Sequence, residues 1–532
     1  MILITSADYV DSELVSEIGL LPPSFLPVAN KRLYELQILL LKKWFVDEVI
    51  YLSLPDCFEM DHEDAKALDK LGANLIYAPR DLSLGESVTN AWIQSGGDHK
   101  TLTILHGDTL IANSPAPVLD SVTAHENRGY YSRAGIYTKQ GKKKHRIEDN
   151  RLIENHQYVA SGCFRFSSPL TLMQMLSNCN HEFMRAVDDY FQKFAVTIAE
   201  EGAWLDFGHL NSFYQSRAML TTERAFNSLK ISEGVVYKSS SSMPLKTECE
   251  AKWFDLLPRH LRLYTPQFLG FHDNGYKLEY LHLIPLSDLF VYGRLAPHSW
   301  VFIFEKLRKM LNAFAAEEQK QDLTAGILRA QNLYLPKTIE RLTKYFEHDP
   351  KANSKYLVTS SEGSEGMTLV DIARKVSKYI PDVKETDLSI IHGDLCFSNI
   401  LFDNRSESIK CIDPRGHLDC YEQTSFGDKR YDIAKLYHSV IGCYDQVISG
   451  RLHEISDHSG WITGSPFQSE IRDHFKRILL EPSGYQIEEI QAICTLLFLS
   501  MIPLHSDSPE RQRLFIQIAL SLASELFSGV SL

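Results

Sequence analysis

The stretch IIHGDLCFSNILFDNRSESIKCIDPRG, residues 390–416, sets three oxygen-bearing side chains between apolar runs. Asp394 and Asn399 lie five residues apart, and Asp413 follows after a hairpin-sized interval. Phosphoryl transfer from a nucleotide needs a carboxylate that accepts the proton of the attacking hydroxyl, and it needs oxygen ligands for Mg²⁺. A short loop followed by a hairpin can bring all three side chains to one point. A single Asp or Asn in a loop usually caps a turn, but the complete set favours a phosphotransfer site.

This segment resembles the catalytic loop and the metal-binding loop of the aminoglycoside phosphotransferase and choline kinase family, which has a protein-kinase-like fold. The resemblance implies that Asp394 is the catalytic base and that Asn399 and Asp413 are Mg²⁺ ligands. It continues downstream in GDKRYDIAKL, where Asp432 stands at the family's position for a structural aspartate at a helix start. The resemblance covers about 300 residues and implies ATP as the phosphate donor.

One departure from the family pattern follows the metal-binding aspartate. Residues 414–416 read Pro-Arg-Gly, where the family usually has Phe-Gly. Arg415 is predicted either to help neutralise phosphate or to form a surface salt bridge, and the sequence does not choose between these. His392, beside the catalytic loop, is predicted to support that loop rather than to react.

The similarity extends upstream to the residues that would hold ATP. Lys238, in VVYKSSSS, resembles the strand lysine that pairs with the α- and β-phosphates. Glu250 resembles the helix glutamate that orients this lysine, and Glu248 is a rival because a helical wheel places the two on opposite flanks of one apolar stripe. In KLEYLHLIPLSDLF, the segment from Glu279 to Leu281 resembles the hinge that offers backbone groups to the adenine ring.

The first half of the chain has a different pattern, in which strand-sized apolar runs alternate with helix-like stretches. The runs lie at residues 2–4, 49–54, 74–78 and 102–105. This alternation is typical of βαβ units and a parallel sheet. Further along, a strand is expected at 159–166 and helices at 170–176 and 181–194.

Four segments of this half resemble sugar-nucleotide nucleotidyltransferases. Residues 19–35, GLLPPSFLPVANKRLYE, resemble the family segment that usually reads Pro-Lys-Pro-Leu-Leu-Pro-Val, and VASGCFRF with Gly162 resembles the strand that lines the sugar pocket. LTILHGDTLI and WLDFGHLNSFYQSRA match the segments that imply Asp108 and Asp206 as Mg²⁺ ligands. Either Asp alone would be a strand-end turn residue, but two carboxylates at strand ends suit a metal clamp on a triphosphate.

The phosphate-binding loop of this half departs from the family. The family has a Gly-rich loop with an Arg after the first strand, because glycine lets backbone N–H groups approach the phosphates closely. Here residues 5–10 contain neither residue, and Pro23 replaces the expected lysine. Lys31 and Arg32 are predicted to supply the missing positive charge. The domain is therefore either an active variant or a nucleotide-binding relic.

The length of 532 residues requires more than one domain. We expect an α/β protein with a Rossmann-like nucleotidyltransferase domain at 1–220 and a bilobal, protein-kinase-like α+β domain at 221–532. The small lobe of the second domain is placed at about 221–290 and its helical lobe at about 291–532.

Composition restricts the partners and the compartment. The chain has 55 basic and 68 acidic residues, a net charge of −13, which disfavours nucleic-acid and polybasic membrane binding. The longest apolar run, at 494–504, is too short to cross a bilayer, and the charged amino terminus is not typical of a signal peptide. Nine scattered cysteines without a CxxC pair indicate reduced thiols in a cytoplasm.

A kinase joined to a nucleotidyltransferase predicts consecutive steps. ATP and Mg²⁺ would phosphorylate a hydroxyl of a small sugar, polyol or amino alcohol, and an NTP, with CTP among the candidates, would then activate that phosphate and release pyrophosphate. The resemblance implies precursor synthesis for a capsule or lipopolysaccharide. Two alternatives stay open: a kinase whose first domain only binds a nucleotide, and a non-catalytic scaffold. The predicted partners are small molecules, and the sequence allows a homo-oligomer without specifying one.

Overall fold

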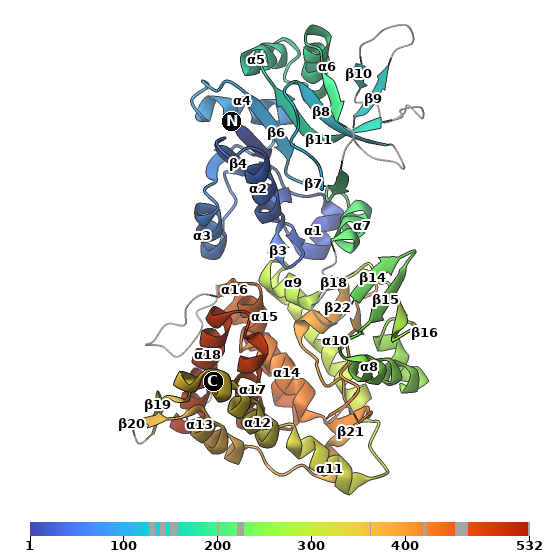
Figure 1. The fold of residues 1–532 in the computed structure, drawn as a ribbon, viewed down its shortest axis with the longest axis vertical. Coiled ribbons are helices and arrows are strands. Elements are labelled where there is room, and N and C mark those ends of the chain that lie inside the picture. The colour runs from blue at the N-terminus through green and yellow to red at the C-terminus, as the bar shows by residue number, and fades with distance from the viewer. Residues whose placement is uncertain are drawn as a thin grey trace. The chain divides into compact units, whose positions relative to one another are not determined.

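The computed structural model describes residues 1–126, 134–138, 145–148, 158–199, 202–220, 228–361, 363–418, 422–452 and 466–529. The chain forms two compact units (Figure 1). Unit 1 comprises Met1–Leu220 with Tyr292–Arg294, and unit 2 comprises Thr221–Val291 with Leu295–Leu532. Each unit has its own hydrophobic core.

Unit 1 has a mixed α/β fold around a parallel-rich sheet. β5 (Asn74–Ala78), β4 (Ile50–Pro55), β1 (Ile2–Thr5) and β6 (Leu102–His106) are parallel neighbours in that order, and β11 (Tyr158–Phe166) joins β6 in antiparallel pairing. Central strands that are covered on both faces read as nearly continuous apolar runs. The strands predicted from these runs and the mixed α/β fold are confirmed.

Helices cover this sheet, and the expected helices are present. α2 (Leu33–Trp44), α3 (His62–Lys70) and α4 (Leu84–Gln94) connect the parallel strands, while α5 (Pro169–Asn178) and α6 (Phe183–Lys193) pack on each other after β11 (Figure 1). One large core fills the space between the sheet and α4, α5 and α6. Such helix-covered parallel strands place their carboxyl ends at one edge, where ligand sites of α/β proteins form.

Unit 2 begins with an antiparallel sheet of four strands in the order β14-β15-β17-β16. The strands are β14 (Ser228–Ser232), β15 (Val235–Ser239), β16 (Phe268–His272) and β17 (Gly275–Glu279). α8 (Pro244–Leu256) contacts β16 and β17, with Pro244 in its first turn and Pro258 just beyond its end. The strand expected at Lys238 and the helix expected at Glu250 are therefore present.

The rest of unit 2 is largely helical, within the range of about 291–532 where the helical lobe is expected. Its long helices are α10 (Pro297–Ala315), α12 (Leu335–His348), α14 (Arg430–Val440), α17 (Ile487–Met501) and α18 (Pro509–Ser528). α17 packs against α12, α14 and α18. The apolar run at 494–504 is expected to be too short to cross a bilayer, but the helical stretch that contains it is longer. Among the described residues, Ile487–His505 is the one helical stretch long and apolar enough to cross a membrane, and 72% of its window is buried inside the protein.

Residues 390–416, which carry Asp394, Asn399 and Asp413, connect two small sheets of unit 2. β21 (Leu388–Ile390) pairs with β24 (Phe426–Asp428), and the hairpin β22 (Ile400–Asp403)–β23 (Ser408–Cys411) pairs with β18 (Ile284–Pro285). The loop between β21 and β22 carries Asp394 and Asn399, and the end of β23 leads to Asp413. Backbone pairing thus fixes both ends of each segment that presents a candidate residue.

Candidate functional site

A buried ion-pair cluster joins the sheet of unit 2 to the loop after β23. The Nζ of Lys238, on β15, lies 2.6 Å from the Oε2 of Glu250 on α8 and 3.0 Å from the Oδ1 of Asp413. The phenol of Tyr276, on β17, donates to the same Glu250 oxygen at 3.0 Å. Burial lowers the pKa of Lys238, but the two carboxylates outweigh burial and raise that pKa overall, so the lysine stays charged.

The partner of the strand lysine is Glu250, not its rival on the same helix. Glu250 is 3% exposed. Glu248 faces solvent and pairs with Lys252 at 2.7 Å, one turn further along the helix. The two glutamates flank the same apolar stripe, so only the packing of α8 against the sheet distinguishes them.

The candidate base is held by an amide and an ammonium group. The Nδ2 of Asn399 donates to the backbone oxygen of Asp394 at 2.9 Å and to its Oδ2 at 3.2 Å. The Nζ of Lys435, on α14, lies 2.7 Å from its Oδ1. Burial alone would raise the pKa of Asp394, but the Lys435 ammonium outweighs it and holds that pKa well below its usual range. The Asp394 carboxylate is therefore ionised at neutral pH, and 45% of its side chain is exposed to solvent.

His392 and Asp432 hold the backbone of this loop. The N–H groups of His392 and Gly393 donate to the two carboxylate oxygens of Asp432 at 2.6 and 2.8 Å. The Nδ1 of His392 accepts from the backbone N–H of Asp394 at 3.3 Å, so its Nε2 carries the hydrogen that reaches the carbonyl of Ile412 at 3.0 Å. Burial lowers the pKa of His392 to about 4, which keeps the ring neutral.

The loop after β23 approaches the base from the other side. Asp413 has a φ of +57°, in the left-handed region that an Asp side chain tolerates better than most. The backbone N–H of Arg415 donates to the carbonyl of His392 at 2.9 Å, and its guanidinium reaches the Tyr431 hydroxyl and the Leu418 carbonyl. Among the described residues Arg415 has no carboxylate within ion-pair distance, which leaves the predicted surface salt bridge without a partner there.

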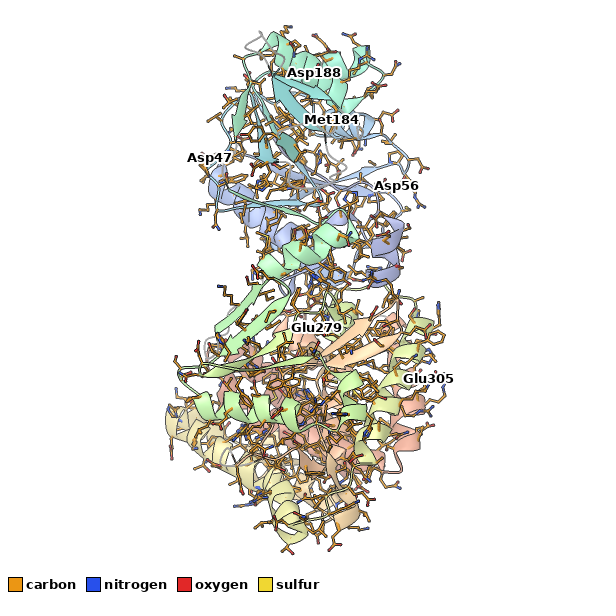
Figure 2. The ribbon with its side chains drawn as sticks, turned by 90° about the vertical axis from the view of Figure 1, so that its right-hand side faces the viewer. Asp47, Asp56, Met184, Asp188, Glu279 and Glu305 are labelled. Carbon is orange, nitrogen blue, oxygen red and sulfur yellow. The ribbon has the colours of Figure 1, made fainter. Side chains whose placement is uncertain are left out.

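The proposed adenine-binding segment lies at the end of β17 (Figure 2). The backbone N–H of Glu279 donates to the carbonyl of Gln267 at 3.0 Å, and its carboxylate accepts from the N–H of Gln267 at 3.2 Å. The N–H of Leu281 has no hydrogen-bond acceptor within the described part of the chain. That backbone group is therefore available to a ligand, whereas the N–H of Glu279 is not.

The donor set fits Mg²⁺. Asn399 directs its amide hydrogens at Asp394. Its Oδ1, which accepts a long hydrogen bond of 3.5 Å from the Ser398 hydroxyl, and the Asp413 carboxylate are the candidate oxygen ligands. In the described residues, no group of three or more His, Cys, Asp and Glu side chains is placed to hold a metal ion. Mg²⁺ commonly uses one or two protein oxygens and takes its other ligands from water and phosphate. Two protein ligands are thus sufficient.

Unit 1 brings its two candidate carboxylates to neighbouring strand ends. β7 (Thr109–Ala112) pairs with β13 (Ala203–Asp206), with Asp206 opposite Thr109. The backbone N–H of Phe207 donates to the carbonyl of Asp108 at 2.8 Å. Gly162, on β11, has a φ of +90°, and a Cβ there would lie 2.9 Å from the Thr109 hydroxyl oxygen. A side chain at 162 would therefore intrude next to the strand that follows Asp108.

The two basic residues predicted to replace the phosphate loop differ in their surroundings. The guanidinium of Arg32 is buried and pairs with Asp64, with 3.0 Å between Nη2 and Oδ2, and it also donates to the carbonyl of Phe25 at 2.7 Å. Lys31 is exposed on the short strand β3 (Lys31–Arg32). Arg32 therefore stabilises the fold of unit 1, and of the two only Lys31 is exposed to solvent.

Sequence reasoning missed Lys435, which contacts the candidate base directly. It lies three residues after Asp432, so one face of α14 carries both the carboxylate that holds the loop backbone and the ammonium that faces Asp394. The i, i+3 spacing within YDIAK was the available signal. The sequence also did not identify Tyr276, because a tyrosine on a strand is usually interpreted as a residue that packs in the core.

Comparisons with protein families and with curated proteins found no match. Among solved structures, the chain is similar to UDP-glucose pyrophosphorylase complexed with UDP-glucose, at 14% identity over 41% of this chain and 97% of that one, with a TM-score of 0.32. It is similar to a nucleoside-diphosphate-sugar pyrophosphorylase from Vibrio cholerae, at 14% identity over 41% and 99%, with a TM-score of 0.33. A putative glucose-1-phosphate thymidylyltransferase from Bacillus anthracis matches at 12% over 42% and 96%, with a TM-score of 0.34.

Proposed function

We propose that unit 2 is a phosphotransferase that moves the γ-phosphoryl group of ATP to a hydroxyl of a small metabolite. The observation that carries this proposal is the convergence of Lys238, Glu250 and Asp413 in one buried ion-pair cluster, beside a second contact set of Asn399 and Lys435 on Asp394. These groups come from five separate segments of unit 2. A structural role for each carboxylate alone would not require two cations and an amide to meet them.

In the proposed reaction the acceptor hydroxyl lies against the Asp394 carboxylate. The acceptor oxygen forms a bond to the γ-phosphorus while the bond from phosphorus to the β,γ-bridging oxygen breaks, ADP leaves, and the hydroxyl proton passes to Asp394. Lys435 keeps the Asp394 carboxylate ionised and weakly basic. The main role of this carboxylate is therefore to orient the acceptor hydroxyl. Lys238, positioned by Glu250, neutralises donor phosphates. When bound to Asn399 and Asp413, Mg²⁺ would supply charge compensation for the phosphate tail.

Replacement of Asp394 tests the proposal. Asp394→Asn keeps the shape of the side chain and removes its basicity, so phosphate transfer from ATP should fall by roughly 10²- to 10⁴-fold, with the thermal unfolding midpoint little changed. The assay is ATP-dependent phosphorylation over a panel of sugars, polyols and amino alcohols. Asp273→Asn, at an exposed turn whose side chain is 83% exposed, is the matched control. Undiminished turnover in Asp394→Asn would exclude this residue as the base.

For unit 1 we propose a nucleotide site at Asp108 and Asp206, with Mg²⁺ between an NTP and the two carboxylates. Nucleotidyl transfer to the phosphorylated product is the first candidate activity. The engagement of Arg32 with Asp64 favours a second candidate, a module that binds a nucleotide without turning it over. Calorimetric titration with CTP, UTP and dTTP, beside a pyrophosphate-release assay on a phosphorylated acceptor, separates the two. Binding without pyrophosphate release would support the second.

Together these activities would make an activated precursor of a surface polysaccharide in the cytoplasm. The eight described cysteines form no disulfide, which agrees with a reducing compartment. We propose small molecules as the partners of this protein. Association of identical chains is compatible with this function, which does not require it. Absence of ATP turnover, nucleotide binding and pyrophosphate release in a folded protein would instead support a non-catalytic scaffold.

A further inference from the structure

Two cationic side chains of unit 2 meet at one buried hydroxyl beside the candidate base. The Nζ of Lys337, on α12, donates to the Oη of Tyr431 at 3.3 Å, and the Nη1 of Arg415 donates to the same oxygen at 3.4 Å. Tyr431, on α14, is 2% exposed. Its oxygen thus accepts from the Lys337 amine and the Arg415 guanidinium, and within the described residues its own O–H hydrogen has no acceptor. Three hydrogen-bonding groups therefore meet at one point.

These groups adjoin the reacting end of the site. Tyr431 precedes Lys435 by four residues on α14, so both side chains lie on one face of the helix, and Lys435 contacts the Asp394 carboxylate. Arg415 is tied through its backbone N–H to the carbonyl of His392, in the loop that carries the base. Lys337 and Arg415 are therefore close enough to Asp394 to interact with its charge, and the acceptor hydroxyl is proposed to lie against that carboxylate.

Among the described residues, the two cations at Tyr431 lack the close carboxylate partner that the other lysines of the site have. Lys238 and Lys435 each have a carboxylate within 3.0 Å, whereas Lys337 and Arg415 have none within ion-pair distance in the part of the chain that the structure describes. Burial and the positive charges of Arg415, Arg341 and Lys435 lower the pKa of Lys337 well below its usual range, with Asp394 opposing them. These surroundings disfavour the charged form of Lys337, and an anionic ligand bound beside Lys337 and Arg415 would favour it.

We propose that the phosphate acceptor itself carries an anionic group, a phosphate or a carboxylate, and that Lys337, Arg415 and the Tyr431 hydroxyl bind it. This inference rests on the phosphotransferase function proposed above. The guanidinium fork of Arg415 suits two oxygens of one anion, and Lys337 adds a point charge. The acceptor hydroxyl is then held against Asp394 by an anchor on the same molecule.

The nearest alternative is that these cations bind the phosphates of ATP. Lys238 and the Mg²⁺ ligands already provide for the donor, so the two roles differ in which substrate loses affinity when a cation is removed. A defect confined to the donor would therefore contradict the proposal, and a defect confined to the acceptor would support it.

The experiment compares three-carbon acceptors that differ in charge: glycerol, glycerate and glycerol 3-phosphate. The full-length protein is assayed with radiolabelled ATP and Mg²⁺, and kcat/KM is determined for each acceptor together with the KM for ATP. We expect a charged acceptor to exceed glycerol by at least tenfold. Preference for glycerol, or equal use of all three, would overturn the inference while leaving the phosphotransferase proposal in place.

Two variants locate the preference. Lys337→Met removes one cation and Tyr431→Phe removes the hydroxyl but keeps the ring. Because a charge-assisted hydrogen bond is stronger than a neutral one, Lys337→Met should reduce the preference for the charged acceptor by about 10- to 100-fold and Tyr431→Phe by less. Lys344→Met, on the exposed side of α12, where Lys344 pairs with Glu340, is the matched control. An unchanged preference in Lys337→Met, or a rise in the KM for ATP alone, would contradict the assignment.

A binding measurement separates this inference from the function on which it rests. Calorimetric titration of glycerol 3-phosphate into the wild-type protein and Lys337→Met requires no turnover. Binding that Lys337→Met weakens supports the anion site even if no acceptor is phosphorylated, in which case only the phosphotransferase proposal fails. Absence of binding to the wild-type protein, in the absence of ATP and in the presence of ADP with Mg²⁺, would overturn the anion site.

Discussion

Among single residues, His392 links the candidate site to the stability of unit 2. It is fully buried, and both ring nitrogens are occupied by backbone groups that require the neutral, Nε2-protonated ring. Burial lowers its pKa to about 4 from an ordinary value near 6.5. The unfolded chain therefore protonates His392 near pH 6.5, whereas the folded protein protonates it only near pH 4.

The sign of the pH dependence follows from this shift. The folded protein keeps its full stability above pH 6.5 and loses stability as the pH falls towards 4, and the total loss is about 3 kcal/mol of the free energy of unfolding. We expect urea unfolding at pH 7.5, 6.5, 5.5 and 4.5 to show this loss, and His392→Gln to flatten the slope. His298→Gln, at an exposed position in the first turn of α10, is the control. An equal slope in His392→Gln and the wild type would contradict the assignment.

At the scale of secondary structure, the contact between α8 and the loop after β23 depends on Gly416. This glycine has a φ of +65°, and a Cβ there would overlap the carbonyl of Cys249, in the turn of α8 that carries Glu250. The Trp253 indole of the same helix donates to the carbonyl of Ile391 at 2.9 Å. The helix that bears Glu250 thus meets both loops of the site, one by a close backbone approach at Gly416 and the other by the Trp253 hydrogen bond.

Gly416→Ala should therefore act on stability and activity together. Gly484→Ala is the matched control, because Gly484 has a φ of +79° but open space around its Cβ position. The control measures the cost of the backbone conformation, about 1 kcal/mol, and Gly416→Ala adds the overlap, which we expect to raise the total to at least about 2 kcal/mol. Urea unfolding and the KM for ATP give the two readouts. Equal losses in both variants would show that the contact is unimportant.

The hairpin β19 (Tyr356–Ser360)–β20 (Gly363–Met367) is an element that the local sequence pattern does not predict. The polar run from 360 to 366 predicts an interruption of the helical pattern and no strand, because it lacks the apolar alternation of a half-buried strand. The structure forms the hairpin against α18, where the N–H of Thr359 donates to the Ser524 hydroxyl and that of Ser361 to the Phe527 carbonyl. Packing on a helix distant in sequence supplies what the strands themselves lack.

For the whole molecule, two compact units predict two separable unfolding transitions. ATP with Mg²⁺ should raise the midpoint of one transition by several degrees, since a ligand at a hundred times its Kd stabilises by about 2.7 kcal/mol. EDTA should remove most of this shift, because Asn399 and Asp413 are proposed to act through the metal. Differential scanning calorimetry of the wild type and Asp413→Asn measures both effects. A metal-independent shift, or none, would contradict the proposed ATP site.

The amino-acid sequence determined the α/β pattern of unit 1 and the spacing of Asp394, Asn399 and Asp413, because period and residue type are properties of a short segment. It could not distinguish Glu250 from Glu248, since both flank the same stripe of α8, and it could not show that Arg32 is engaged by Asp64. Those outcomes, with the meeting of Lys337 and Arg415 at Tyr431, depend on how separate elements pack. Such contacts join residues tens to hundreds of positions apart, and only the tertiary structure decides which of the available charges meet.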